Sequence, residues 1–559
     1  MTSEKTIELT PVEGIKQRSN YLRGTIAEGL ADTATGALAE GDTQLSKFHG
    51  FYQQDDRDIR NERLRQKLEP SYSFMIRVRV PGGIATSEQW LALDELAREY
   101  GNNTLRLTSR QAFQFHGVAK GNLKKTIRGI NDSLLDTIAA CGDVNRNVMC
   151  TPLAEKSAIH QAAFATATAI SERLTPHTRA YHEIWLDGEK IAGTADAEPV
   201  YGATYLPRKF KIAVAIPPSN DVDIYSQDLG FIAIEKNGEL VGFNVTAGGG
   251  MGMTHGEPGT YPRAADVVGF CTVNQAVEVA EHVVGLQRDH GDRTNRKHAR
   301  LKYTIDDRGL SWFREELHTR LGYALSEPRK FAFTSRGDQF GWSRNLSGKW
   351  DLALFVPQGR IKDEGRHRLL TGLREVARIH KGDLRLTANQ NLIISGVDSN
   401  ARQTIERLFD YYGVAELQQV SPLRQQALAC VALPTCALAM AEAERYLPEM
   451  NSKIEALLGK HELLDEAITL RITGCPNGCV RPYLAEIGLV GKAPGRYNLF
   501  LGGSADGRRL NRMAHENLDE DRILELLDGL LAKFVAARRD QESFGDFANR
   551  AYAPLAEAS

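Results

Sequence analysis

The sequence predicts an internally duplicated α+β protein, and three observations lead to this fold class. Two thirteen-residue segments match, LRLTSRQAFQFHG at 105–117 and LRLTANQNLIISG at 384–396. A second pair, VPGG at 80–83 and VPQG at 356–359, recurs at nearly the same separation. A helix-like segment lies between the paired motifs in each copy. Because chance rarely gives two echoes at one spacing, we expect two related units that pair about a pseudo-twofold axis.

The elements of each copy follow from the periodicity of their side chains. In the first copy, FMIRVRV (74–80) alternates as a strand does. In the next segment, SEQWLALDELAREYG, Ser87 is the expected helix N-cap and Gly101 the expected stop. Its apolar residues share one helical face: Trp90, Leu93, Leu96 and Ala97. The second copy has the helix RHRLLTGLREVARIHKG, which stops at Gly382. We therefore expect strand, helix, strand, helix in each copy.

Composition and the repeat together divide the chain into five segments. Residues 1–70 are polar and charged, so we expect an arm that wraps the core or meets a partner. The amphipathic segment DEDRILELLDGLLAKFVAARRD is expected to pack on the core as a helix. The expected boundaries are 1–70 for the arm, 71–138 and 346–418 for two half-domains, 139–345 for a first α/β domain and 419–559 for a second.

Charge and hydropathy exclude several classes of protein. The 559 residues include 69 basic and 71 acidic side chains, a balance that argues against a general nucleic-acid binder. The N-terminal segment has no apolar core of the signal-peptide kind, and no apolar run approaches the ~18 residues of a membrane span. We expect a cytoplasmic protein without a membrane. In a reducing compartment its seven cysteines are not expected to form a disulfide framework.

Basic side chains alternate with apolar ones along several expected strands. In the first repeat, Leu105, Leu107, Phe113 and Phe115 fall on one face of a strand. The opposite face has Arg106, Thr108, Arg110, Gln114 and His116. The same alternation places Arg77 and Arg79 together, and Lys209 and Lys211 together, with Arg146 in a further segment.

A solvated outer face is the simplest interpretation of any one of these strands. The second repeat argues against it, because Asn389, Ile393 and Ser395 replace Arg110, Gln114 and His116 there. A solvated face has no reason to lose its charge in one copy only, so we expect the first copy to bind anions. Arginine suits carboxylates and lysine suits a small oxyanion. The pattern therefore indicates a polycarboxylate cofactor and a small anionic substrate.

Four cysteines form two clusters, CVALPTC at 430–436 and TGCPNGC at 473–479. Their spacings, Cys-x5-Cys and Cys-x3-Cys, suit structural zinc poorly, whereas an iron–sulfur cluster tolerates varied spacing. Pro476 and Gly478 favour a tight turn whose N–H groups point at sulfur. Zinc and buried free thiols remain alternatives. The isolated Cys141, Cys150 and Cys271 are expected to be buried free thiols.

These motifs resemble the sulfite and nitrite reductases that combine sirohaem with a four-iron four-sulfur cluster. The similarity extends over nearly the whole chain and is greatest with haemoprotein (beta) subunits of NADPH-dependent assimilatory sulfite reductases. It rests on SNYLRGTIAEGL, HGFYQQDDRDIR, KLEP, LTSRQAFQFHG, VNRNVMC, TYLPRKFK, IHKGDLRLTANQNLI, ACVALPTC, LAMAEAER, GLVGKAPGRYNL and TGCPNGC. One departure is Val480, where relatives are expected to have glycine. The resemblance implies ferredoxin-like half-domains and two sirohaem/iron–sulfur α/β domains.

The resemblance also implies roles for individual residues. The cluster ligands would be Cys430, Cys436, Cys475 and Cys479, with Cys479 also the ligand of the sirohaem iron. The basic residues around the substrate would be Arg79, Arg146, Lys209 and Lys211. Contacts to the sirohaem would come from Arg106, Arg110, Gln114, His116, Arg208, Gln390 and Asn477.

The implied activity is six-electron reduction of sulfite to sulfide, in sulfate assimilation and cysteine biosynthesis. The Gly-rich segment at 248–256 does not fit a dinucleotide loop, and no P-loop is present in the sequence. The electrons would therefore come from a flavoprotein (alpha) subunit that binds NADPH, FAD and FMN, and the arm at 1–70 is a candidate contact. Sirohaem-dependent nitrite reduction is the alternative enzyme, and a structural metal-thiolate protein is the non-enzyme alternative.

Overall fold

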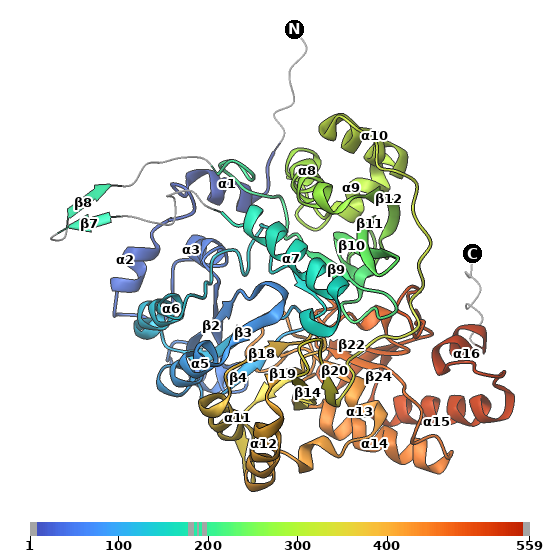
Figure 1. The fold of residues 1–559 in the computed structure, drawn as a ribbon. Helices are drawn as coiled ribbons and strands as arrows, with labels where there is room; N and C mark the ends of the chain where they lie inside the picture. Colours follow the sequence, from blue (N-terminus) through green and yellow to red (C-terminus); the bar gives the residue numbers. More distant parts are fainter. Residues whose placement is uncertain (1–7, 177–183, 187–188, 193–197, 552–559) are drawn as a thin grey trace.

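The computed structural model describes residues 8–176, 184–186, 189–192 and 198–551. Within these ranges the strands form four five-stranded sheets and two small two-stranded sheets, and helices pack around them (Figure 1). Elements of the first copy have counterparts in the same order in the second. The predicted α+β class and the predicted duplication are therefore confirmed.

The two half-domain sheets exchange a strand across the pseudo-twofold axis. Their strand orders are β1-β2-β5-β4-β15 and β13-β14-β19-β18-β3. β15, from the second copy, pairs with β4, and β3, from the first copy, pairs with β18. Neither sheet is complete without the other copy. These strands span Phe51–Asp55 (β1), Tyr72–Val78 (β2), Ile84–Thr86 (β3), Leu105–Leu107 (β4), Phe113–Val118 (β5), Gly341–Arg344 (β13), Trp350–Leu354 (β14), Arg360–Ile361 (β15), Asp383–Leu386 (β18) and Leu392–Val397 (β19).

Helices of both copies pack on these sheets over one shared core. Trp90 and Leu93 of the first helix are fully buried, and the apolar cluster around them includes residues of both copies. The predicted N-cap at Ser87 was wrong by one residue. Thr86 is the cap, because its hydroxyl accepts from the backbone N–H of Gln89 and the Gln89 side chain accepts from the backbone N–H of Thr86. The helices are α5 (Ser87–Glu99), α6 (Leu123–Asp132), α11 (Leu369–Ile379) and α12 (Ser399–Tyr411).

The repeated motif is a hairpin and not the single strand that its alternation predicts. β4 and β5 are antiparallel, with Arg106 opposite Gln114 and Leu107 opposite Phe113. The chain reverses at Gln111, which has a φ of 49°. Because opposite residues of an antiparallel pair lie on the same face, the predicted separation of apolar and polar faces still holds.

The other two sheets also correspond between the copies. Their orders are β12-β11-β10-β9-β6 and β20-β21-β22-β23-β24. In each, a central strand is parallel to both neighbours, β9 to β6 and β10, and β21 to β20 and β22. The strands span Met149–Cys150 (β6), Ile212–Ala215 (β9), Leu229–Lys236 (β10), Glu239–Ala247 (β11), Asp266–Cys271 (β12), Leu428–Ala429 (β20), Leu470–Thr473 (β21), Ile487–Ala493 (β22), Arg496–Leu501 (β23) and Arg512–Leu518 (β24).

Helices cover these two sheets on the outside of the molecule. The predicted C-terminal amphipathic helix is α15, whose Ile523, Leu527 and Phe534 are buried in the core of the second α/β unit. The helices here are α7 (Ala158–Arg173), α8 (Ala276–His290), α9 (Leu301–Arg308), α10 (Leu310–Leu321), α13 (Pro422–Gln426), α14 (Leu447–Lys460), α15 (Glu520–Ala537) and α16 (Phe544–Ala551). The small sheets pair β7 (Ile184–Leu186) with β8 (Glu189–Ala192) and β16 (Asp363–Glu364) with β17 (His367–Arg368).

The described part of the N-terminal arm packs on the body of the protein. Its β1 extends the first sheet by pairing with β2. Lys16 is almost fully buried, donates to the carbonyl of Leu206 at 2.9 Å and forms an ion pair with Glu13. The arm helices are α1 (Pro11–Arg18), α2 (Ile26–Ala31), α3 (Glu40–Leu45) and α4 (Arg60–Arg65). None of the helices in the described ranges is long and apolar enough to cross a membrane.

Candidate functional site

The two cysteine motifs leave one sheet at the same edge. β20 and β21 are parallel neighbours, Cys430 follows β20 directly, and Cys475 lies just beyond the end of β21. The backbone N–H of Gly474 donates to Sγ of Cys430 at 3.3 Å. The Asn477 amide donates to Sγ of Cys475 at 3.5 Å. Donors to sulfur stabilise thiolate charge, so both motifs are prepared for anionic sulfur.

The turn inside TGCPNGC requires its glycine. Gly478 has a φ of +60°, and a Cβ there would lie 3.0 Å from the carbonyl oxygen of Met251. The Gly-rich loop thus packs against the turn, and Met253 N–H donates to the carbonyl of Pro476 at 3.0 Å. Val480 is buried, and the left-handed residue is the next one, Arg481, with a φ of 59°. The Val480 departure therefore demands no left-handed backbone.

The four thiols share one region. Burial first, and then the neighbouring Cys479, raise the pKa of Cys430 well above its usual range, that of Cys436 to about 11, and that of Cys475. Yet nowhere in the described chain do three His, Cys, Asp or Glu side chains converge on a position for one metal ion. The spacings of the two motifs still favour an iron–sulfur cluster over a structural zinc ion. Cys479 is the most exposed of the four.

Two lysines beside this region have no counter-charge. Lys209 and Lys211 keep partial solvent exposure although protein surrounds them, which indicates a recess. Neither ammonium group forms a hydrogen bond or ion pair with any described residue. Burial, followed by nearby arginines and, for Lys211, by Lys209, lowers the pKa of both ammonium groups well below the usual range. Cys479 acts on the pKa of Lys209 in the opposite direction, so the thiol and the lysine lie within electrostatic range.

Of the two arginines predicted to bind substrate, Arg146 lies within electrostatic range of both lysines, whereas Arg79 contacts α7. Nη1 of Arg79 donates to Ser171 Oγ at 3.3 Å and Nη2 of Arg146 donates to the carbonyl of Gly142 at 3.3 Å. The Nε of both arginines is buried without a partner. Burial, followed by other arginines, lowers the pKa of Arg110 to about 9 and that of Arg208 to about 10. Asp143 and Asp228 offset part of this arginine charge, whereas the two ammonium groups have no carboxylate partner among the described residues, and this excess of cations favours an anionic ligand.

The residues predicted to contact the sirohaem differ in whether their donors are already used by other groups of the protein. Arg106 is 2% exposed, and its guanidinium donates to Glu444 and to the carbonyls of Gln358 and Ala429. These contacts make Arg106 a clamp between the two copies. Its expected role at the sirohaem stays a prediction.

Three polar side chains that are predicted to contact the sirohaem differ in whether they have a hydrogen-bond partner. The Oε1 of Gln114, in the orientation that satisfies its hydrogen bonds, accepts from Arg77. Nε2 of His116 and Oε1 of Gln390 are buried without partners. Burial, followed by neighbouring arginines, lowers the pKa of His116 well below 6.5, so its imidazole is neutral.

Two arginines of this region were given no role from the sequence. Arg77 was predicted to share a strand face with Arg79, but its bond to Gln114 depends on the β2–β5 register. Arg300 pairs with Asp228 and lowers the pKa of both lysines. No motif marks Arg300, because its place depends on the ion pair with Asp228, which lies 72 residues away in the chain.

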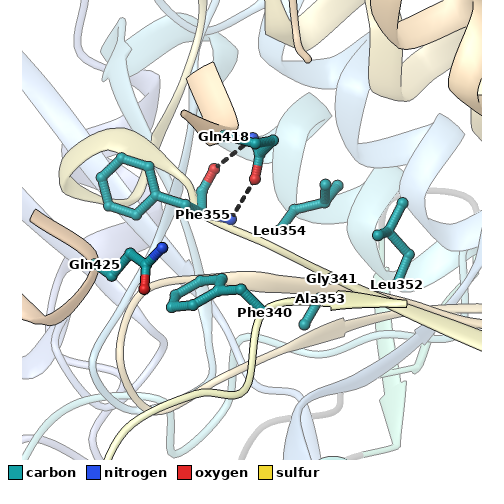
Figure 2. Close-up of a pocket in the computed structure, with 8 residues that line it drawn as sticks. All are labelled: Phe340, Gly341, Leu352, Ala353, Leu354, Phe355, Gln418 and Gln425. Atoms are coloured by element: carbon teal, nitrogen blue, oxygen red, sulfur yellow. Dashed lines mark hydrogen bonds between the residues drawn. The ribbon is translucent and has the colours of Figure 1, made fainter. Parts of the chain in front are cut away.

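The second copy has a pocket at the counterpart of Arg77. Strand registers align Ala353 with Arg77, because these residues lie opposite Ile393 and Gln114 of the repeated motif. A cavity of about 330 Å³ lies here, with Phe340 and Phe355 among its walls (Figure 2). It is lined by Phe340, Gly341, Leu352, Ala353, Leu354, Phe355, Gln418 and Gln425. None of these side chains is charged, so this pocket of the second copy has no basic group of its own.

Comparison with known proteins defines first a class and then a family. A nitrite/sulfite reductase ferredoxin-like half domain matches residues 65–133 and 346–410, one match in each copy. A nitrite and sulphite reductase 4Fe-4S domain matches residues 165–325. The chain therefore belongs to the nitrite and sulfite reductase family. The four cysteines lie outside these matches, so their ligand roles remain predictions.

Relatives support the family over nearly the whole length. The sulfite reductase [NADPH] hemoprotein beta-component of Myxococcus xanthus is 59% identical and covers 97% of this chain and 96% of its own. The protein of the same name from Geobacillus kaustophilus is 57% identical, covering 97% and 95%. The solved NirA protein of Mycobacterium tuberculosis has a TM-score of 0.79 at 25% identity and covers 98% of this chain and 97% of its own.

Proposed function

We propose that this chain is the haemoprotein component of an assimilatory sulfite reductase. It reduces sulfite to sulfide with six electrons, in sulfate assimilation and cysteine biosynthesis. The Myxococcus and Geobacillus relatives bear that name across nearly their full lengths. The observation that supports sulfite most is the pair Lys209 and Lys211, two ammonium groups without a carboxylate partner among the described residues, and Lys209 lies within electrostatic range of the exposed Cys479 thiol.

The residues present fit the two cofactors of the family. Cys430, Cys436, Cys475 and Cys479 would hold a four-iron four-sulfur cluster, and the exposed Cys479 would also be the ligand of the sirohaem iron. Arg110, Arg208, Gln114, His116, Gln390 and Asn477 would contact the sirohaem. The buried, unpartnered His116 Nε2 and Gln390 Oε1 are polar atoms that need such a ligand. When bound, the cofactors supply the electron transfer.

The chain's own task is to bind an oxyanion and deliver protons. Arg79 and Arg146 hold positive charge beside the recess with Nε donors free. Lys209 and Lys211, with lowered pKa values, release a proton more readily than ordinary lysines. Each loss of an oxygen as water consumes two protons, so donors of this kind are required next to the substrate.

A flavoprotein subunit that binds NADPH, FAD and FMN is the proposed electron donor, and the arm at 1–70 is the proposed part of its contact. Cytoplasm is the proposed location, because the thiols must stay reduced to hold a cluster. Nitrite carries less charge than sulfite, so a recess with two unpaired lysines favours sulfite over nitrite.

An absorption spectrum with iron and acid-labile sulfide analysis tests the proposal. We expect a sirohaem spectrum, about five irons per chain, and a spectral shift when sulfite meets the reduced protein. Four irons without a haem band would identify a cluster protein of another function. A protein without iron would instead indicate that the four cysteines bind zinc or are free thiols. Comparing kcat/KM for sulfite and nitrite decides between the two substrates.

A further inference from the structure

A buried charge cluster lies next to the cysteine turn. Arg481 follows Cys479 by two residues, and its Nε donates to Oδ2 of Asp223. Its Nη1 donates to the carbonyl of Ser109 and its Nη2 to the carbonyl of Ala388, both at 2.9 Å. The fork of Arg481 is thereby fixed on three sides, by three segments that are far apart in the sequence.

These contacts place Arg481 on the pseudo-twofold axis. Ser109 and Ala388 are equivalent residues of the two repeated motifs. The registers of β9 with β10 and of β21 with β22 make Asp223 the counterpart of Arg481. Both residues are left-handed, with φ of 48° and 59°, and each precedes a short 3₁₀-helix, η5 (Ile224–Ser226) and η9 (Pro482–Leu484). The duplication has therefore put opposite charges at one position of its two copies.

Asp223 is the centre of this cluster. Its side chain is fully buried, and Nη1 of Arg471 donates to Oδ2 at 2.6 Å. Nε of Arg336 lies 3.6 Å from Oδ1. Arg471, on β21, also donates to the carbonyl of Arg481 at 3.2 Å. One carboxylate thus neutralises part of the charge of three buried guanidinium groups, which would repel one another without it.

The cluster connects directly to the backbone of Cys479. Ser109 Oγ donates to the carbonyl of Cys479 at 3.0 Å. Arg481 in turn holds the carbonyl of Ser109. Cys479, Arg481 and Ser109 therefore form a closed ring of contacts. These contacts hold the backbone that carries the exposed Cys479 side chain.

We propose that Asp223 is a positioning residue for Cys479. From the first copy it fixes Arg481, and Arg481 sets the direction of the Cys479 thiolate toward the recess of Lys209 and Lys211. This inference rests on the proposed function, in which that thiolate joins the cluster to the sirohaem iron. Asp223 itself touches neither substrate nor cofactor.

Asp223→Asn in the cofactor-loaded protein tests the proposal. Asparagine has nearly the same shape and tolerates the left-handed region, so the change removes the charge and turns one acceptor oxygen into an N–H donor. The matched control is Asp94→Asn, since Asp94 is also fully buried and faces two arginines, Arg98 and Arg374. Both variants should lose thermal stability. Only Asp223→Asn should weaken the magnetic coupling of cluster and haem iron in paramagnetic resonance spectra and lower turnover about tenfold or more.

Ser109→Ala gives a second test that does not depend on a buried charge. It removes the bond to the Cys479 carbonyl, so we expect a smaller spectral change in the same direction at unchanged melting temperature. Wild-type coupling in both Asp223→Asn and Ser109→Ala at full iron content overturns the proposal, as does an equal shift in Asp94→Asn. If Asp223→Asn does not fold, Ser109→Ala decides. A wild-type protein without haem and cluster overturns the proposed function as well.

Discussion

Replacing Lys209 and Lys211 by methionine tests the anion recess most directly. Methionine keeps an unbranched side chain and removes the charge. A cation about 4 Å from a bound anion contributes about 4 kcal/mol at an effective dielectric constant of about 20. Loss of one donor to developing negative charge typically lowers turnover about 10²–10³-fold. We expect that loss in kcat/KM for each single variant, and less than the product in the double variant because both lysines act on one oxyanion.

We expect the methionine variants to lose activity but to keep or gain thermal stability. Neither lysine has a counter-charge in the described chain, so removing a buried unpaired cation should leave the melting temperature equal or higher. Lys16→Met is the matched control, because Lys16 is buried but paired with Glu13 and Asp143. That control should lose stability and keep its kcat/KM for sulfite. Steady-state sulfite reduction and thermal unfolding of the loaded protein measure both quantities.

Two results would refute this reasoning about the recess. Full kcat/KM in the double variant would mean that the substrate lies elsewhere. A melting temperature that falls as in Lys16→Met would mean that the lysines are paired and structural. The absorption spectrum should stay unchanged in every variant, since neither lysine is an expected ligand of iron.

Three further predictions concern the same site. Burial and neighbouring cations lower the pKa of Lys209 and Lys211 in the free enzyme, and a bound anion raises it again. Sulfite binding should therefore take up protons and weaken as pH rises. Calorimetry in two buffers measures the uptake, and equal uptake in the wild type and the methionine variants would contradict this prediction. Cys479→Ser should abolish sulfite reduction and cluster–haem coupling, and full activity with both cofactors bound would exclude the bridging role. Glu444→Gln leaves Arg106, which is 2% exposed, without its counter-charge and should cost about 3 kcal/mol in urea unfolding, whereas a cost below about 1 kcal/mol would show that the pair is dispensable.

The repeat in the sequence predicted the duplication but not the way in which the copies join. Local periodicity identifies strands and helices, because it depends on neighbours a few residues away. The exchange of β3 and β15 depends on pairing between residues far apart in the chain, for which no local pattern exists. The hairpin at Gln111 was missed although the alternation stops at the polar run 108–111, because no Gly or Pro marks the turn.

The candidate site likewise has residues that the sequence predicted and residues that it did not. Cysteine spacing and alternating basic residues are local signals, and they pointed to Cys430, Cys479, Lys209 and Lys211. The partners of Arg106 and the place of Asp223 were not predictable. Arg106 alternates like a ligand-binding arginine, yet its donors are used by Glu444 and two carbonyls. Which of several equivalent arginines remains free depends on packing between copies.

The two copies have diverged in opposite ways around one shared axis. The first copy keeps the cations, while the registers put uncharged Ala353 at the position of Arg77 and Thr469 at that of Lys211. The second copy keeps the thiols, and at the position of Cys479 the first has Asp221, which accepts a hydrogen bond from Thr151.

Each copy therefore supplies what the other lost. Cations for an oxyanion come from the first and sulfur for electron transfer from the second. Reduction needs both within reach of one substrate, so the geometry between copies must be fixed more tightly than within either. The strand exchange, the Arg106–Glu444 clamp and the Asp223–Arg481 pair all lie on that boundary. Rigidity there, more than the stability of either half, is what selection on this activity would preserve.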